Sequence, residues 1–228
     1  ARRHKIQKII FPSSSAVYGG DSQDPCKEED SLEPMSPYAV TKLAGEHLLE
    51  VYRATYGLPY VAFRFFNVYG PRQNPEGGYA AVVPAFIQAA LRGEGLTIYG
   101  DGEQTRDFVY VEDVANAMRV AMDRGVGVYN IGCREAVTIN DLARNITKIA
   151  SSESAMHYES PSDGDILYSL ADVVKVKQEL GWAPQWSLQQ GMESTVAWYK
   201  ATAGSHCSAL VAFDRPPTVP PLRFNDHF

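Results

Sequence analysis

The sequence has few of the side chains that form disulfide bridges or hold metal ions. It contains three cysteines in 228 residues, and no two of them form a Cys-x-x-Cys pair. Its five histidines are scattered and form no His-Glu-x-x-His pattern. These absences argue against a disulfide framework and against a zinc site. We therefore expect no bound metal and a reducing, cytoplasmic setting.

Positive charge and long apolar runs are also scarce. The formal net charge is −6 and the isoelectric point is near 5.4, so the sequence offers no basic surface for nucleic acid or for an anionic membrane. The apolar run at residues 9–11 is too short for a signal peptide or a membrane span. We expect neither a nucleic-acid partner nor membrane association.

What the sequence does have is an alternation of strand-like and helix-like segments. Short apolar runs predict strands at 8–11, 59–65, 96–99, 108–111 and 128–131, and helical spacing predicts helices at 37–56, 82–91, 113–122, 138–150, 173–180 and 187–201. The strands at 96–99 and 108–111 flank the turn Gly100-Asp101-Gly102. This alternation indicates an α/β fold with a mostly parallel sheet that is covered on both faces.

Tyr38 and Lys42 lie four residues apart, and so on one face of the long helix predicted at 37–56. A tyrosine phenol has a pKa of about 10, and a neighbouring ammonium lowers that pKa enough to make the phenol a usable base. The spacing alone also fits a solvated pair on a helix surface. The serine-rich stretch at 12–19 strengthens the catalytic interpretation, because it follows a strand and can fold back toward this helix.

Four motifs extend this pattern along the chain. They are Ser13-Ser-Ser-Ala-Val-Tyr-Gly19, Ser36-Pro-Tyr-Ala-Val-Thr-Lys42, Arg64-Phe-Phe-Asn-Val-Tyr-Gly-Pro-Arg72 and Thr105-Arg-Asp-Phe-Val-Tyr-Val-Glu-Asp113. Through them the chain resembles the NAD-dependent epimerase/dehydratase family, in the extended branch of the short-chain dehydrogenase/reductase superfamily, and within it the UDP-sugar 4-epimerases. The resemblance covers residues 9–200. It implies a Rossmann-type parallel sheet, a smaller α/β substrate-binding domain and NAD as the cofactor.

The resemblance also implies a role for each matched residue. Tyr38 would act as the base, Ser14 would hydrogen-bond the sugar hydroxyl and the phenol, and Lys42 would hold the nicotinamide ribose. Phe65 would join Tyr38 and Lys42 in binding the cofactor. The implied contacts with the UDP-sugar, whose diphosphate the two arginines would approach, are at Ser14, Ser15, Asn67, Arg72, Val83, Arg106, Asp165 and Ser169.

The reaction that this resemblance implies is epimerisation at carbon 4 by transient oxidation to a 4-keto sugar. The substrate pair would be UDP-glucose and UDP-galactose, or UDP-N-acetylglucosamine and UDP-N-acetylgalactosamine. Related dehydratases carry Asp-Glu, and UDP-glucuronate decarboxylases carry Glu, where this sequence has Ser15 and Ala16. Both alternatives are therefore disfavoured. Ser169 falls where strict glucose enzymes have a bulky aromatic residue, which favours an N-acetylated sugar.

The sequence departs from the family pattern in two places. Family members usually have Arg-Pro-Gly-Asp where this chain has Ser162-Asp163-Gly164-Asp165, so one phosphate or uridine contact is expected to be absent. A half-domain on the order of 100 residues, with the Gly-rich turn that holds the pyrophosphate, would also precede Ile9. We therefore expect a sheet truncated at the N-terminus with very low affinity for NAD. A third alternative is an inactive family member that serves only as a binding or oligomerisation module.

The expected division of the chain follows from the same resemblance. Residues 1–69 would form the C-terminal part of the NAD-binding domain, joined by a strand from the 107–132 region. Residues 70–201 would form mainly the substrate-binding domain, and the proline-rich stretch 202–228 would be a mobile tail. A homodimer is also expected, since relatives dimerise through the tyrosine-bearing helix and the helix before it, although the second of these is not in this chain.

Overall fold

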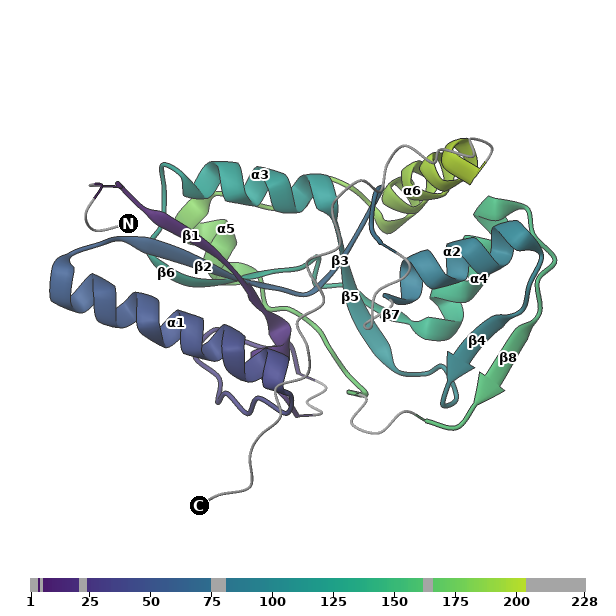
Figure 1. The fold of residues 1–228 in the computed structure, drawn as a ribbon, viewed down its shortest axis with the longest axis horizontal. Helices are drawn as coiled ribbons and strands as arrows, with labels where there is room; N and C mark the ends of the chain where they lie inside the picture. The colour runs from purple at the N-terminus through teal and green to yellow at the C-terminus, as the bar shows by residue number, and fades with distance from the viewer. Residues whose placement is uncertain (1–3, 5, 21–23, 75–80, 162–165, 204–228) are drawn as a thin grey trace, which may run out of the picture.

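The computed structural model describes residues 4, 6–20, 24–74, 81–161 and 166–203, and two groups of elements lie side by side in it (Figure 1). The first group contains a parallel sheet in the order β1-β2-β6, made of Ile9–Ser14, Tyr60–Phe65 and Gly127–Ile131. The second contains β3 (Asn67–Tyr69), β5 (Thr105–Tyr110) and β7 (Ala136–Thr138), and a separate parallel pair of β4 (Leu96–Tyr99) and β8 (Met156–Glu159). The α/β architecture predicted from the sequence is confirmed.

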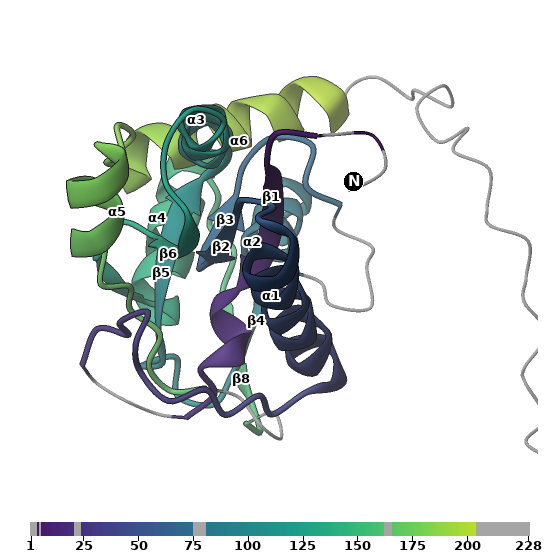
Figure 2. The same ribbon diagram turned by 90° about the vertical axis from the view of Figure 1, so that its left-hand side faces the viewer.

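Helices cover both faces of the first sheet (Figure 2). The apolar side chains of β2 that include Val61 and Phe63 pack under α3 (Val111–Ala121) and α5 (Val174–Leu180). The alternate residue Arg64 points to the opposite face and pairs with Glu46 of α1 (Pro37–Tyr56). This alternation follows from the two-residue period of a strand, and it explains why β2 is buried on both sides.

The second group has its own core beneath α2 (Val82–Arg92), α4 (Ile139–Ala150) and α6 (Leu188–Ala203). Two helix starts predicted from the sequence, at 138 and 187, are confirmed by the hydrogen bonds that cap them. The Thr138 hydroxyl accepts a hydrogen bond from the Asp141 amide at 3.0 Å. At the start of α6, the Ser187 hydroxyl accepts from the Gln190 amide at 3.3 Å and the Gln190 side chain accepts from the Ser187 amide at 3.1 Å.

Two features of the strands differ from the sequence-based prediction. The first strand does not stop before Pro12 but continues to Ser14, because a strand that is paired along one edge tolerates a residue without an N–H. The strands β4 and β5 do not pair with each other across the turn that joins them. Gly102 has a φ of 77°, and a methyl group there would meet the Asn140 side chain of α4 at 2.2 Å. The turn therefore packs against α4 and directs β5 away from β4.

The helix α1 leaves an apolar strip uncovered, at Val40, Leu48 and Val51, which are 51%, 58% and 56% exposed. A partner would cover such a strip, and the homodimer expected from the sequence stays a prediction. Within the described ranges, no helix combines the length and the apolar character needed to cross a membrane. The tail expected at 202–228 lies outside the described residues beyond 203.

The buried carboxylate of Asp107 ties β5 to two loops. Its Oδ1 accepts the Cys133 amide at 2.7 Å, and its Oδ2 accepts the amides of Arg134 and Ala171 at 2.9 and 3.1 Å. Its backbone oxygen accepts the Asn67 side chain at 3.2 Å. Burial raises the pKa of Asp107 from 3.8 to about 6, although the three N–H donors oppose the rise. One acidic side chain thus joins segments that are far apart in the sequence.

We predict that Asp107 makes the stability of the fold depend on pH between about 4 and 6. The pKa of Asp107 is higher in the folded chain than its ordinary value of 3.8. Its contribution to the free energy of unfolding is therefore complete below pH 3.8 and is lost as the pH rises through about 6. In urea unfolding, the stability of the wild type relative to Asp107→Asn should fall by on the order of 3 kcal/mol from pH 4 to pH 7.

The matched control is Asp141→Asn, which changes a carboxylate whose side chain is 61% exposed. The relative stability of this variant should show little of that pH dependence. A relative stability that instead rises from pH 4 to pH 7 for Asp107→Asn would mean that the N–H donors outweigh burial.

Candidate active site

A cavity of about 300 Å³ opens where β1 and β2 end and the second group of elements begins. Parallel strands place their carboxyl ends at one edge of a sheet, and ligands in open α/β sheets bind outside that edge. The short 3-10 helix η2 (Ser15–Val17) follows β1 there. The residues that line the cavity come from both groups and are Ser14, Ser15, Ala16, Phe65, Phe66, Asn67, Arg106, Ile166 and Ser169.

The cavity brings together most of the residues that the sequence assigns to the site. The predicted residues among its lining are Ser14, Ser15, Phe65, Asn67, Arg106 and Ser169. The Ser14 hydroxyl accepts a hydrogen bond from the Ala16 amide at 3.2 Å and so caps η2. The Asn67 amide group donates to the backbone oxygen of Asp107, and Arg106 Nη1 donates to the Thr105 backbone oxygen at 2.8 Å. Hydroxyls, an amide and a guanidinium therefore face one space.

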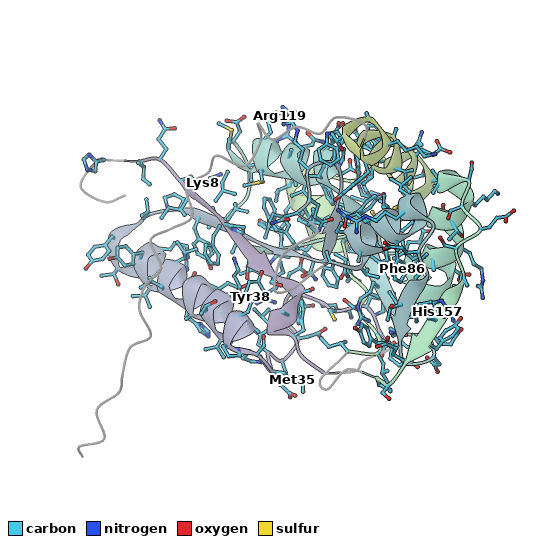
Figure 3. The ribbon with its side chains drawn as sticks, turned by 45° about the vertical axis from the view of Figure 1, so that its right-hand side comes forward. Lys8, Met35, Tyr38, Phe86, Arg119 and His157 are labelled. Carbon is cyan, nitrogen blue, oxygen red and sulfur yellow. The ribbon has the colours of Figure 1, made fainter. Side chains whose placement is uncertain are left out.

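Tyr38 lies at the start of α1, close to the end of β1 (Figure 3), and Lys42 follows it one helical turn later. The Lys42 ammonium is 5.4 Å from the centre of the Tyr38 ring and donates to the Pro12 backbone oxygen at 2.8 Å. The predicted pairing of ammonium and phenol is thus present, directed at the strand that delivers Ser14. Neither side chain lines the cavity itself, and Tyr38 is 47% exposed.

Two predicted substrate contacts are not among the residues that line the cavity, and a third lies outside the described residues. Arg72 is exposed and has a φ of 68°, so its backbone turns away from the strand that precedes it. Val83 is only 2% exposed, because it shares the apolar face of α2 with Phe86 and Ile87 and packs into the core. The side chain of Val83 thus belongs to the core and not to the cavity lining, and the substrate contact expected there stays a prediction. Asp165 lies outside the described residues.

A buried ion pair that was not predicted from the sequence links α1 to β2 next to the site. Glu46 and Arg64 are 5% and 3% exposed, and their side chains make two hydrogen bonds, at 2.7 and 3.1 Å. The Ser13 hydroxyl also donates to Glu46. The signal was available, since Arg64 interrupts an apolar strand and Glu46 lies one helical turn beyond Lys42.

A second set of contacts links this pair to the loop after η2. The Arg64 guanidinium lies 4.8 Å from the centre of the Tyr18 ring, and the Tyr18 hydroxyl donates to Asn130 at 2.7 Å. Burial raises the pKa of Tyr18 well above its ordinary value, which the nearby Arg64 only partly offsets. Tyr18 is therefore a neutral structural side chain.

The described residues hold no cluster of three or more His, Cys, Asp or Glu side chains that could bind a metal ion. Cys26 and Cys133 are both free thiols, and burial raises the pKa of Cys133 to about 12. A thiol that is protonated at neutral pH is a poor nucleophile, so the chemistry of the site falls to the hydroxyl, phenol, ammonium and guanidinium groups.

Comparison with known proteins identifies a family and several similar enzymes. The model of the NAD dependent epimerase/dehydratase family matches residues 1–132. A UDP-glucose 4-epimerase of Mycolicibacterium smegmatis is 36% identical over 88% of this chain. The structure of a UDP-N-acetylglucosamine 4-epimerase from Methanobrevibacter ruminantium is 40% identical over 88% of the chain with a TM-score of 0.85. The NAD complex of the Thermus thermophilus UDP-glucose 4-epimerase is 35% identical over 87% with a TM-score of 0.82.

The chain spans 64%, 65% and 66% of the lengths of these three proteins, so it corresponds to less than two thirds of each. The matched residues include the serine stretch, the Tyr38–Lys42 helix and Arg106. The family resemblance read from the four motifs is confirmed, and the chain belongs to the NAD dependent epimerase/dehydratase family.

Proposed function

We propose that the chain carries the catalytic residues of an NAD-dependent UDP-sugar 4-epimerase. The observation that carries this proposal is the convergence of Ser14, Asn67 and Arg106 on one cavity at the carboxyl ends of β1 and β2, with Tyr38 and Lys42 on the adjoining helix. A nucleotide-sugar needs donors for its diphosphate and hydroxyls for its sugar, and this set supplies both. The names of the relatives at 35% to 40% identity support the same reaction.

The residues present fit the nicotinamide end of NAD. Lys42 and Tyr38 offer donors for a ribose, and Phe65 offers an aromatic ring in the cavity wall. The printed sequence contains no Gly-x-x-Gly-x-x-Gly turn for the pyrophosphate. When it is bound, the cofactor supplies the acceptor, and then the donor, of the hydride at carbon 4 of the sugar.

In the proposed mechanism, Tyr38 takes the proton of the sugar 4-hydroxyl as the hydride leaves carbon 4. Lys42 would hold the ribose of the cofactor beside Tyr38, since its ammonium lies 5.4 Å from the centre of the Tyr38 ring. The Ser14 hydroxyl bonds the reacting oxygen. Arg106 and Asn67 would hold the diphosphate, so that the 4-keto sugar could turn about it and present its other face. Tyr38 then gives the proton back to the oxygen, so no net oxidation occurs.

The lining of the cavity supports epimerisation over elimination of water or loss of carbon dioxide. Elimination needs an additional acid and base next to the sugar. Among the described lining residues, the positions after Ser14 hold Ser15 and Ala16, and no side chain there is a carboxylate. The dehydratase and decarboxylase alternatives therefore lack the groups they require at this place.

The first test is turnover of UDP-galactose by the full natural polypeptide with NAD added. Replacing Tyr38→Phe should lower kcat by roughly 10² to 10⁴-fold, because the general base is removed. The control is Tyr56→Phe, which alters a tyrosine on the same helix that is also 47% exposed, and kcat should stay within about twofold of the wild type. Full activity of Tyr38→Phe, or release of water or carbon dioxide from a UDP-sugar, would refute the proposal.

A second test concerns the sugar. We infer that Ser169, which lines the cavity, leaves room for an N-acetyl group. Ser169→Tyr should lower kcat/KM for UDP-N-acetylglucosamine relative to UDP-glucose by roughly 10- to 100-fold, since the added ring fills that space. Leu167→Tyr, at an exposed position outside the cavity lining, should leave the ratio unchanged. An unaltered ratio for Ser169→Tyr would show that the acetamido group binds elsewhere.

A further inference from the structure

The helix α1 is fastened to two consecutive residues of β1. The Lys42 ammonium binds the Pro12 backbone oxygen at 2.8 Å, and the Glu46 carboxylate accepts the hydroxyl of Ser13. The next residue of the strand is Ser14, which lines the cavity. The position and rotation of α1 are thus fixed by contacts with the two residues that precede Ser14, the serine proposed to bind the reacting oxygen.

Arg64 completes this attachment from the neighbouring strand. It is the register partner of Ser13 in the parallel sheet, and both residues converge on Glu46. The guanidinium binds both carboxylate oxygens of Glu46, while its Nη1 donates to the Glu28 backbone oxygen at 3.1 Å. Its face lies against the Tyr18 ring in the loop after η2. One buried cation therefore joins α1, β2 and the serine turn.

The position of Glu46 along α1 excludes direct contact with a substrate at Tyr38. Eight residues separate them, which is roughly 12 Å along a helix that rises 1.5 Å per residue. Tyr38, Lys42 and Glu46 recur every fourth residue, so they share one side of the helix. A buried ion pair adds little net stability compared with apolar residues, and its best-supported use is to fix one register among several.

We propose that Glu46 is a positioning residue, which binds Arg64 and Ser13 together and so holds α1 where Tyr38 can reach a sugar hydroxyl beside Ser14. The inference rests on the proposed function and deepens it. A shift of about 1 Å in a reacting group is enough to slow a reaction about 100-fold, even when the change lies far from the chemistry. Substrate binding by Asn67 and Arg106 does not pass through α1 and should be preserved.

The test compares Glu46→Gln with Glu50→Gln in the full natural polypeptide with NAD added. Both variants remove one carboxylate charge from α1, but Glu50 pairs with Arg53 at the surface, where the two side chains are 47% and 45% exposed. Glu50 also accepts the Tyr60 hydroxyl at 3.2 Å, and the side-chain oxygen of a glutamine can still accept it. For Glu46→Gln we expect kcat to fall roughly 10- to 100-fold with KM within about threefold of the wild type. For Glu50→Gln we expect both constants to stay close to those of the wild type.

Amide hydrogen exchange supplies a readout that does not need activity. Glu46→Gln should speed exchange in the first turns of α1 and in residues 13–17, while α2 and α4 keep their protection. If Glu46 served stability alone, Glu46→Gln would instead raise exchange throughout the chain. Its activity would then fall below that of the wild type only near the unfolding temperature. Glu50→Gln should leave the exchange of all these segments unchanged.

The outcomes separate the two proposals. Wild-type kcat for folded Glu46→Gln, or loss of protection spread evenly over the chain, would overturn the positioning role. If Glu46→Gln does not fold, Ser13→Ala is the substitute, because it removes only one of the hydrogen bonds to Glu46. This variant should lower kcat several-fold and lose protection only near α1 and residues 13–17. Unchanged kcat and exchange in Ser13→Ala would overturn the positioning role. If the wild type turns over no UDP-sugar, the proposed function fails, and the exchange comparison still decides whether Glu46 holds α1 in place.

Discussion

Two opposite charges that are buried together constrain the whole arrangement. Glu46 and Arg64 are almost fully removed from solvent, and a lone charge in that environment would be strongly unfavourable. The helix α1 can therefore cross between β1 and β2 in only one rotation and at only one height, because any other would leave one of the charges without its partner. The crossover connects two parallel strands, and their parallel pairing brings the carboxyl ends of β1 and β2 to one edge.

A second buried acid plays the corresponding part in the other group of elements. Asp107 receives amides from the loop after β6 and from the segment at Ala171, and its backbone receives the side chain of Asn67. Its sequence neighbour Arg106 and the nearby Ser169 both line the cavity. The two sides of the cavity are thus each held in place by one buried carboxylate, Glu46 on the side of β1 and Asp107 on the side of β5.

The sequence predicted the long elements well because their signals are local. Three helices begin after an N-capping hydroxyl, at Ser36, Thr138 and Ser187. The glycines after α1 and α2 adopt the left-handed conformation that ends a helix. The strands β3, β7 and β8 were missed because each has three or four residues and is stabilised by partners that are distant in the sequence. The pairing of β4 with β8 instead of β5 is likewise a tertiary choice.

Most of the candidate site residues that the sequence predicted correctly as cavity lining lie within the four motifs. Ser14, Asn67, Arg106 and Ser169 converge as expected, while Val83 belongs to a core that periodicity alone could have assigned. Glu46 and Arg64 went unrecognised because charged residues usually lie at the surface, although the place of Arg64 within an apolar strand already pointed to a buried cation. The roles of individual residues, the division into domains and the cytoplasmic setting stay predictions.

The proline within β1 has a consequence for the behaviour of the isolated chain in concentrated solution. Within the described residues, β1 bonds only to β2, and an exposed strand border of that kind invites other molecules to add to it. Pro12 supplies no N–H, and its oxygen is already held by Lys42. The Ile9 N–H already bonds the Pro59 backbone oxygen, so of the residues before Pro12 in β1 only Ile10 directs its backbone groups to the other edge. The lysine proposed to assist the base thus also occupies the backbone oxygen that Pro12 would offer to a foreign strand.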